Sequence, residues 1–316
     1  MMPIACVGTG TVGRSWAIAF ARSGREVRLW DPNPPSVDRA MEQIADALRA
    51  PADKSLGDEA GAQILGRLRV CSTLDEAIAG CEHIQESAPE RLELKRALFA
   101  TLDEATPIGV VLASSTSALR GSLFAEHLVG RGRVIVAHPV NPPHLVPLVE
   151  VCPTPWTDRA TTDRTHALMT EIGQTPIHVA QEVTGFVLNR LQWALLGEAL
   201  HLVDAAICSP ADIDKVLTDG LALRWAFAGP FEVGHLNDVA GFRGYFANLG
   251  SSIDQVRQDL CVRHPATPEL IDRVHAALCA RIPEGEIPNR QVWRDEEILA
   301  LRRHLNKRAF RETNRK

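Results

Sequence analysis

The chain has 316 residues, of which 45% are hydrophobic and 23% charged, and its formal net charge is −5. A chain of this length and composition buries more than one hydrophobic core, so two globular domains are expected. The scattered Lys and Arg residues offer no basic surface for nucleic acid, and no apolar stretch reaches membrane-spanning length. A small-molecule partner is therefore favoured.

Seven cysteines are spread along the chain, with no Cys-x-x-Cys pair and no neighbouring histidine cluster. An odd number at wide spacing is typical of free thiols in a reducing compartment and offers no ligand set for a metal. The N-terminal residues contain neither a basic segment nor a long apolar core of the kind that directs secretion. The sequence predicts a cytoplasmic protein without disulfides and without a metal centre.

Short apolar segments alternate with helical periodicities through the first half of the chain. The segment Ile4–Val7 predicts a buried strand, residues 12–23 predict a helix that ends at Gly24, and Glu26–Trp30 predict a second strand that stops at Asp31. This alternation indicates a mostly parallel sheet covered by helices on both faces. Further strands are predicted at residues 68–71, 83–86, 110–113, 134–137 and 148–152, followed by a helix at 158–172 and an edge strand at 176–179.

The pattern changes near Glu182. From Gly185 onward the sequence shows long helical periodicities, as in residues 186–206, and few segments with strand character. The predicted fold class is α/β, with a doubly wound, Rossmann-type sheet in residues 1–182 and an all-helical domain in residues 183–316.

The turn after the first strand reads Gly8-Thr-Gly-Thr-Val-Gly13 and opens a helix. Such a glycine pattern also occurs in ordinary tight turns, but a strand before it and a helix after it favour a dinucleotide-binding site. Gly8 permits the sharp turn, Gly10 lets the backbone approach a pyrophosphate, and Gly13 allows close packing of helix on sheet. Thr11 and Val12 would present backbone N–H groups at the positive end of the helix.

Asp31 ends the second predicted strand, and none of the residues just after it is Lys or Arg. A carboxylate at this position accepts hydrogen bonds from the ribose hydroxyls of NAD and repels the 2′-phosphate of NADP. The predicted cofactor is therefore NAD.

Polar residues follow the ends of later strands, where open parallel sheets bind their ligands. The hydroxyl groups of residues 114–117 follow one strand, and His138 follows the next. Histidine has a suitable pKa to accept a proton from an alcohol, although a single histidine is more often structural. Glu150 lies in an otherwise apolar strand, where a buried carboxylate needs a partner such as His138. Asn189 places an amide on an apolar background at the first helix of the second domain, where a capping or core-satisfied asparagine is the structural alternative to a functional one.

Taken in order, the glycine turn, the Ser-x-Thr-Ser loop, His138-x-x-Asn-Pro, Leu-Val-Glu150-Val and Gly-Phe-x-x-Asn189-Arg resemble the L-3-hydroxyacyl-CoA dehydrogenase family. The resemblance implies a Rossmann domain that binds NAD and a helical domain that forms a homodimer. It implies His138 as the catalytic base, with Glu150 as its partner. It further implies that Ser117 and Asn189 bind the hydroxyl or carbonyl oxygen of the substrate.

The same resemblance points to Glu90 and Lys95 as contacts to the nicotinamide half of NAD. Considered without the resemblance, these residues begin an amphipathic helix, and their charges would simply be solvated.

Arg224 distinguishes the chain from the coenzyme A branch of that family, because it places a guanidinium in an apolar segment. A buried Arg needs an anion, either a free substrate carboxylate or a structural partner such as Glu232 or Asp219. Residues 36–66 contain Lys54 but no basic cluster for the tail of coenzyme A. Both features favour a free acid over a thioester.

The sequence therefore predicts NAD-dependent oxidation of the 3-hydroxyl of a small 3-hydroxy acid. Strings such as Gln291-Val-Trp-Arg-Asp-Glu296 resemble a branch of the family that oxidises L-gulonate. Carnitine and 3-hydroxybutyryl-CoA stay open as substrates, and so does a non-enzymatic role as an NAD-binding structural or sensor protein.

Overall fold

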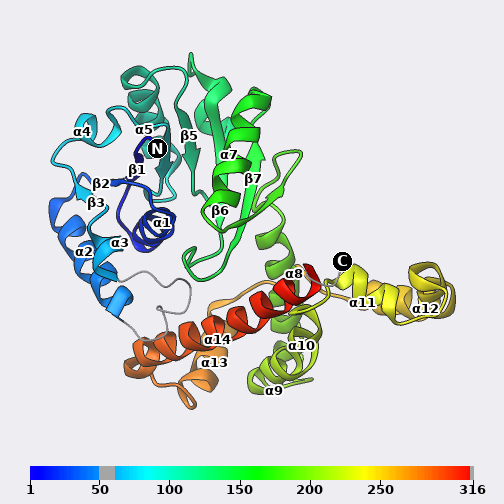
Figure 1. The fold of residues 1–316 in the computed structure, drawn as a ribbon. Helices are drawn as coiled ribbons and strands as arrows, with labels where there is room; N and C mark the ends of the chain where they lie inside the picture. The colour runs from blue at the N-terminus through cyan, green and yellow to red at the C-terminus, as the bar shows by residue number, and fades with distance from the viewer. Residues whose placement is uncertain (50–60, 314–316) are drawn as a thin grey trace. The chain divides into compact units, whose positions relative to one another are not determined.

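The computed structural model describes residues 1–49 and 61–313, with side chains up to residue 305, so Lys54 lies outside the described residues. The chain forms two compact units (Figure 1). The larger consists of Met1–Asn189 with Val292–Lys316, and the smaller of Arg190–Gln291. A functional boundary between residues 182 and 183 stays a prediction.

The larger unit contains one sheet of eight strands in the order β3-β2-β1-β4-β5-β6-β7-β8. Every neighbouring pair is parallel except β6 and β7, which confirms the mostly parallel, doubly wound sheet. The winding reverses between β1 and β4, the point at which such sheets bind ligands. The strands are β1 (Ile4–Val7), β2 (Val27–Trp30), β3 (Leu68–Val70), β4 (His83–Glu86), β5 (Val111–Ser114), β6 (Val134–Pro139), β7 (Leu148–Pro153) and β8 (Thr175–His178).

Helices cover both faces of this sheet, and the apolar runs of the sequence supply a core to each face. In β1, Ile4 and Cys6 pack with α1, whereas Ala5 and Val7 face the core that contains Phe99 of α5. The helices of this unit are α1 (Thr11–Arg22), α2 (Pro34–Arg49), α3 (Gly61–Leu65), α4 (Leu74–Ile78), α5 (Leu92–Ala105), α6 (Ser122–Ala125), the short η2 (Arg131–Arg133) and α7 (Arg159–Glu171).

The remainder is helical, and no strand occurs among the described residues beyond β8. The helix expected from residue 186 begins at Leu188, because Gly185 and Phe186 have φ values of 75° and 47° and belong to a turn. The helices are α8 (Leu188–Asp204), α9 (Pro210–Lys215), the π-helical η3 (Val216–Leu221), α10 (Ala222–Trp225), α11 (Pro230–Leu236), α12 (Gly241–Asp259), α13 (Pro268–Cys279), η4 (Glu284–Glu286) and α14 (Ile287–Thr313).

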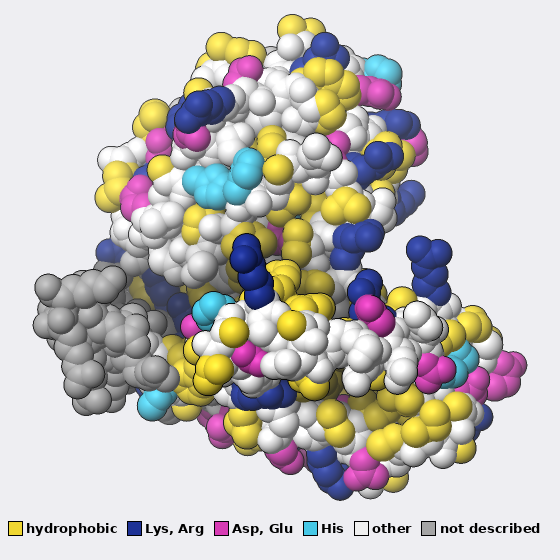
Figure 2. Space-filling view, turned by 90° about the vertical axis from the view of Figure 1, so that its right-hand side faces the viewer, with side chains coloured by type: hydrophobic (Ala, Val, Ile, Leu, Met, Phe, Trp, Pro, Cys, Tyr) yellow, Lys and Arg dark blue, Asp and Glu magenta, His cyan; other side chains and the backbone are white. Residues whose placement is uncertain are grey.

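The smaller unit exposes many large apolar side chains. Trp193, Leu223 and Phe231 are 57%, 62% and 78% exposed. Hydrophobic side chains, in yellow, are spread over the helical part of the molecule in Figure 2. No described helix combines the length and the apolarity that crossing a membrane requires. Apolar surface of this extent is typical of proteins that cover it by association.

Candidate active site

The glycine turn joins β1 to α1 through close backbone contacts. Gly8 has a φ of 93°, and a Cβ atom there would lie 2.7 Å from the carbonyl oxygen of Ser87. A Cβ atom on Gly13 would overlap the carbonyl oxygen of Gly8, whereas the space beside Gly10 is open. Helix α1 begins at Thr11 without a side-chain cap, so its first N–H groups can bind an anion.

Asp31 follows β2 and lines the same cleft as the glycine turn, with a cavity volume of about 770 Å³. Its carboxylate accepts hydrogen bonds from the backbone N–H of Thr9 at 3.0 Å and from that of Asn33 at 3.0 Å. None of the described residues that line the cleft is Lys or Arg. The cleft therefore fits NAD, because a fixed carboxylate can meet the ribose hydroxyls and nothing in this lining neutralises a 2′-phosphate.

Strands β6 and β7 place His138 directly opposite Glu150 in the antiparallel register. The Nδ1 atom of His138 lies 2.7 Å from Oε2 of Glu150, and the two residues are 5% and 0% exposed. Because a carboxylate only accepts, Nδ1 carries the hydrogen and Nε2 of the neutral ring presents a lone pair. Among the described residues, none forms a hydrogen bond with Nε2. The pair thus has the geometry of an oriented base.

The second oxygen of Glu150 is held by the start of helix α8. Oε1 accepts the backbone N–H groups of Val187 at 2.8 Å and Leu188 at 2.9 Å. The turn at Gly185 and Phe186 directs these groups toward the carboxylate, and it places the fully buried Phe186 ring 5.6 Å from the His138 ring, between centroids. One short segment therefore positions both members of the pair.

The charge of Glu150 results from these contacts. Burial raises the pKa of Glu150, but hydrogen bonds from His138 and from the backbone N–H groups of Leu188 and Val187 outweigh burial and hold the pKa below its ordinary value. The carboxylate is ionised at neutral pH and can stabilise a protonated imidazole.

Ser117 and Asn189 are joined by a direct contact. The Nδ2 atom of Asn189 donates to the backbone carbonyl of Ser117 at 2.8 Å, and the Ser117 side chain is exposed. Glu90 holds the same loop from the other side, because its Oε1 accepts the N–H groups of Ser117 at 3.0 Å and Ala118 at 2.9 Å and the hydroxyl of Thr116 at 2.6 Å. Burial raises the pKa of Glu90, but these hydrogen bonds and Lys95 outweigh burial and lower it.

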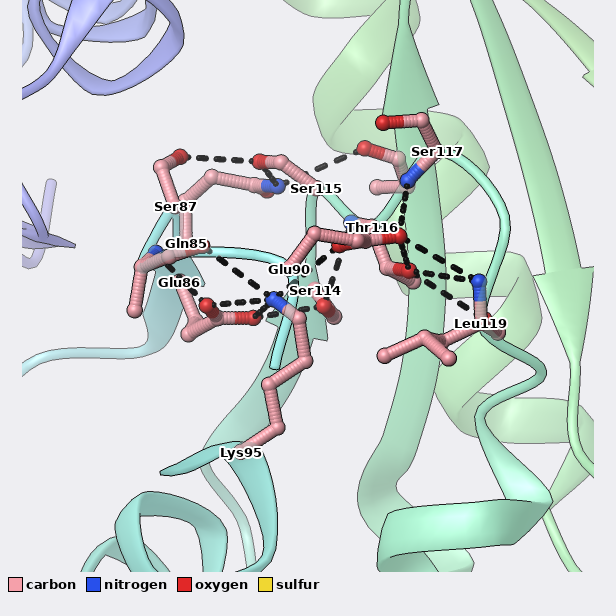
Figure 3. A network of polar contacts seen from close by, with 12 residues as sticks. Gln85, Glu86, Ser87, Glu90, Lys95, Ser114, Ser115, Thr116, Ser117 and Leu119 are labelled. Atoms are coloured by element: carbon pink, nitrogen blue, oxygen red, sulfur yellow. Dashed lines mark hydrogen bonds and ion pairs between the residues drawn. The ribbon is translucent and has the colours of Figure 1, made fainter. Parts of the chain in front are cut away.

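A buried ion pair lies next to this loop and contacts Glu90 (Figure 3). The Nζ atom of Lys95 lies 2.7 and 2.9 Å from the two oxygens of Glu86, and the side chains are 1% and 0% exposed. The hydroxyl of Ser114 donates to Glu86 at 2.5 Å, and Glu90 lies 3.7 Å from Lys95. The alternative of a solvated charge is wrong for Lys95, which is an internal link between β4, β5 and α5.

Sequence reasoning missed Glu86, and it included Ser115 only as one hydroxyl of the loop at residues 114–117. Glu86 ends a strand that reads His83-Ile-Gln-Glu86, in which polar residues outnumber apolar ones, so a carboxylate does not conflict with its sequence neighbours there as Glu150 does. The hydroxyl of Ser115 accepts hydrogen bonds from Gln85 at 2.7 Å and from the indole of Trp16 at 3.1 Å. These partners come from other strands and helices, so no local pattern reveals them.

Arg224 lies in the smaller unit, on the short helix α10 directly after the π-helical η3. The expectation that its guanidinium is buried is wrong, because the residue is exposed. Within the described part of the chain it forms no ion pair with Glu232 or Asp219. π-Helical turns occur frequently at functional sites. A role for Arg224 in holding a substrate stays a prediction.

A glycine turn at the switch point of a doubly wound sheet, a fixed carboxylate in the same cleft, and a buried His–Glu pair on two neighbouring strands define an NAD-dependent alcohol dehydrogenase. Residues 3–183 match the NAD binding domain of 3-hydroxyacyl-CoA dehydrogenase, and residues 185–273 match its C-terminal domain. The chain belongs to the 3-hydroxyacyl-CoA dehydrogenase family. It is an NAD-dependent oxidoreductase that acts on a CH–OH group, as the sequence predicted.

Several relatives cover nearly the whole chain. Lambda-crystallin of Oryctolagus cuniculus is 42% identical over 93% of this chain and 93% of its own. L-carnitine dehydrogenase of Nocardiopsis dassonvillei is 43% identical over 96% of this chain and 91% of its own. The crystal structure of a 5-formyl-3-hydroxy-2-methylpyridine 4-carboxylic acid 5-dehydrogenase, an NAD⁺-dependent dismutase, has a TM-score of 0.83 at 26% identity and covers 96% of this chain and 98% of that one.

Proposed function

We propose that this protein oxidises the 3-hydroxyl of a small free 3-hydroxy acid to the 3-keto acid, with His138 as the general base. The 2.7 Å contact between Nδ1 of His138 and Glu150 carries the proposal, because it leaves Nε2 as the proton acceptor. NAD, held by the glycine turn and Asp31, would supply the hydride acceptor for the carbinol carbon, and the alcohol proton would be left for the protein to remove.

The proton moves from the substrate hydroxyl to Nε2 of His138 as the C–O bond becomes a carbonyl. The imidazole is then a cation between the substrate and Glu150, whose anionic carboxylate lowers the energy of that state. Return of the proton to a carbonyl oxygen is the first proton transfer of the reverse reaction. The protein thus supplies proton transfer in both directions from one residue.

Ser117 and Asn189 are proposed to hold the reacting oxygen. The Asn189 amide uses one N–H for the Ser117 carbonyl and retains a second, while Ser117 is an exposed residue of a loop that Glu90 fixes. Donors that are fixed in advance stabilise negative charge on oxygen without reorganising. Glu90 and Lys95 are proposed to keep this loop beside the nicotinamide half of NAD.

A free acid is favoured over a thioester by the names of the relatives and by Arg224. Carnitine carries a free carboxylate, and the dehydrogenase with a similar structure is named for a carboxylic acid. The Arg224 guanidinium, which is exposed in the chain, can form a bidentate contact with such a carboxylate. L-gulonate is the first acid to test, because of the sequence strings that resemble the gulonate branch.

Oxidation of a 3-hydroxyacyl-CoA is the second candidate, since both family models that match the chain carry that name. The two substrates differ in charge at the carbonyl end, because a thioester has no carboxylate for Arg224 to bind. A panel of L-gulonate, L-carnitine, 3-hydroxybutyrate and 3-hydroxybutyryl-CoA, assayed by NADH formation, separates them. Turnover of the thioester alone would overturn the proposal of a free acid.

A homodimer through the helical unit is also proposed, with residues 183–316 as the substrate and dimerisation domain. The exposed side chains of Trp193, Leu223 and Phe231 support it, because a lone chain in water rarely leaves so many large apolar groups uncovered. Sedimentation velocity at increasing protein concentration tests this state. A chain that stays monomeric at micromolar concentration would exclude it.

A further inference from the structure

Three side chains that commonly bind transition metals meet in the smaller unit, away from the residues assigned above. They are His201 on α8, and Cys261 and His264 in the segment between α12 and α13. One ligand atom from each lies within 4.8 Å of the others, and all three residues are partly buried. The Sγ atom of Cys261 lies 3.9 Å from Nδ1 of His264.

Backbone contacts hold the Cys261 segment against helix α8. A Cβ atom on Gly197 would overlap the carbonyl oxygen of Val262, so the two segments touch at a position where only glycine fits. One residue along the helix, Glu198 accepts the backbone N–H of Cys261 at 2.6 Å. His201 lies one turn further on the same face. Backbone contacts of the fold therefore bring the ligand atoms together.

A second layer of contacts orients His264. Its Nε2 atom lies 3.0 Å from Oδ2 of Asp204, and Oδ1 of Asp204 accepts a hydrogen bond from Arg273 at 2.5 Å. An Nε2–H that donates to this carboxylate leaves the lone pair on Nδ1, which faces Cys261. Metal-binding histidines are oriented by this same kind of carboxylate contact.

We propose that His201, Cys261 and His264 bind one Zn²⁺ ion, and that it fastens the Cys261 segment to helix α8. Two imidazole nitrogens and one thiolate are a donor set that suits Zn²⁺, and a water molecule or another ligand would complete the tetrahedron. At bond lengths of about 2.0–2.3 Å, ligand atoms in a tetrahedron are closer together than 4.8 Å, so the three side chains would have to approach one another as the metal binds. The thiol of Cys261 releases its proton as the metal–sulfur bond forms.

A second cluster, of His275, Cys279 and Glu284, provides a matched comparison in the same unit. Its His275 and Glu284 side chains are 56% and 73% exposed, whereas that of His264 is 15% exposed. Glu284 is itself a possible ligand in that cluster, whereas Asp204 contacts a ligand of the first cluster without being one. The partly buried cluster, with its orienting Asp204, is the better site.

The proposal departs from the expectation that the cysteines have no metal-binding neighbours. Cys261 and His264 are three residues apart, and such a pair alone is a weak signal. Only the fold adds His201 from a distant helix.

The test uses the full chain, stripped of metal with a chelator and dialysed against Zn²⁺. Bound zinc is measured by atomic emission, and affinity by competition with a chromogenic chelator. We expect one equivalent of Zn²⁺ per chain in the wild type and in Cys279→Ser, and a loss of about tenfold or more in affinity in Cys261→Ser and His264→Asn. Co²⁺ in place of Zn²⁺ should give a thiolate charge-transfer band in the wild type that disappears in Cys261→Ser.

Asp204→Asn retains the three ligands and removes only the charge that orients His264. It should still bind Zn²⁺, about 10–100-fold more weakly. Circular dichroism of the metal-free proteins establishes that each variant is folded. Failure of the wild type to bind zinc, or equal affinity in wild type and folded Cys261→Ser, would overturn the proposal. A charge-transfer band lost in Cys279→Ser instead would assign any metal to the exposed cluster.

Discussion

Replacing Glu150 by Gln changes the charge of the acid–base pair and almost nothing of its shape. The native carboxylate accepts three hydrogen bonds, from His138, Val187 and Leu188. An amide offers only one acceptor oxygen, and two backbone N–H groups claim it at the start of helix α8. The amide NH₂ then faces Nδ1 of His138, which must become an acceptor. The hydrogen of the neutral ring moves to Nε2, and in this tautomer Nε2 cannot take a proton from an alcohol.

The expected decrease in kcat equals the contribution of acid–base catalysis that the substitution removes. Positioned acid–base catalysis contributes about 10²–10⁴ in rate, or roughly 3–5 kcal/mol of barrier at 25 °C. Glu150→Gln should lose most of this in kcat, because both the tautomer and the support for a protonated ring are removed. NAD should bind as before, since the glycine turn and Asp31 lie on other strands.

The assay is NADH formation under saturating NAD and substrate, with NAD affinity measured separately by fluorescence titration. Glu171→Gln is a matched control, because it makes the same chemical change at a carboxylate that pairs with Arg25 instead of His138. The control should keep wild-type kcat. A folded Glu150→Gln enzyme with kcat within tenfold of the wild type would refute the tautomer argument and weaken the assignment of His138 as the base.

Four further outcomes follow from particular contacts. Asp31→Ala should weaken NAD binding by roughly 1.5–3 kcal/mol and reduce discrimination against NADP, which parallel titrations of the two cofactors measure. Arg224→Met should raise KM for free acids about 10–100-fold, a loss of roughly 1.5–3 kcal/mol, while KM for a thioester changes little; equal losses on both would reject its role. Lys95→Met should cost about 3–5 kcal/mol of stability by leaving Glu86 buried and unpaired, and adding Glu86→Gln should restore part of the loss in denaturant unfolding. Because the pKa of Glu150 is lowered in the folded state from 4.5, its contribution to stability is complete above pH 4.5 and disappears as pH falls through the folded value, so the Tm difference between wild type and Glu150→Gln should shrink in acid.

The sheet was predictable because most of its inner strands are buried on both faces and read as short apolar runs. In β1 every residue is at most 1% exposed, and a short apolar run between turn residues is typical of such a strand. Strand ends were less certain, and β2 begins at Val27 where the prediction began at Glu26. The antiparallel direction of β7 was not predicted, because apolar runs carry no information about strand direction.

The candidate site was predictable only where one residue conflicts with its surroundings. Glu150 in an apolar strand demands a partner, and the contact with His138 is formed. Arg224 was singled out by the same rule, but its apolar neighbours are themselves exposed, so the inference of burial failed. Composition of a helix does not reveal which of its faces is covered, and in this unit large apolar side chains often face outward.

Contacts between segments that are distant in the sequence are revealed neither by apolar runs nor by a residue that conflicts with its neighbours. Lys95 and Glu86 become partners because α5 returns over β4, and Glu90 gains its role from N–H groups of a loop on another strand. Their sequence pattern is that of an ordinary helix start. Polar networks of this kind depend on the packing of several elements, which periodicity cannot convey.

Residues 185–189 lie after the predicted end of the NAD-binding domain at residue 182, yet they contact the candidate catalytic residues of that domain. Its backbone N–H groups hold Glu150, its aromatic ring packs on His138, and Asn189 holds the Ser117 loop. A Rossmann domain cut at residue 182 would keep the glycine turn and lose all three contacts. Buried and without those donors, Glu150 would be harder to ionise, and His138 would lose the charge that orients it. In the proposed mechanism, proton transfer therefore needs a longer piece of chain than cofactor binding does, one that includes the start of helix α8, although most of that helix lies in the smaller unit.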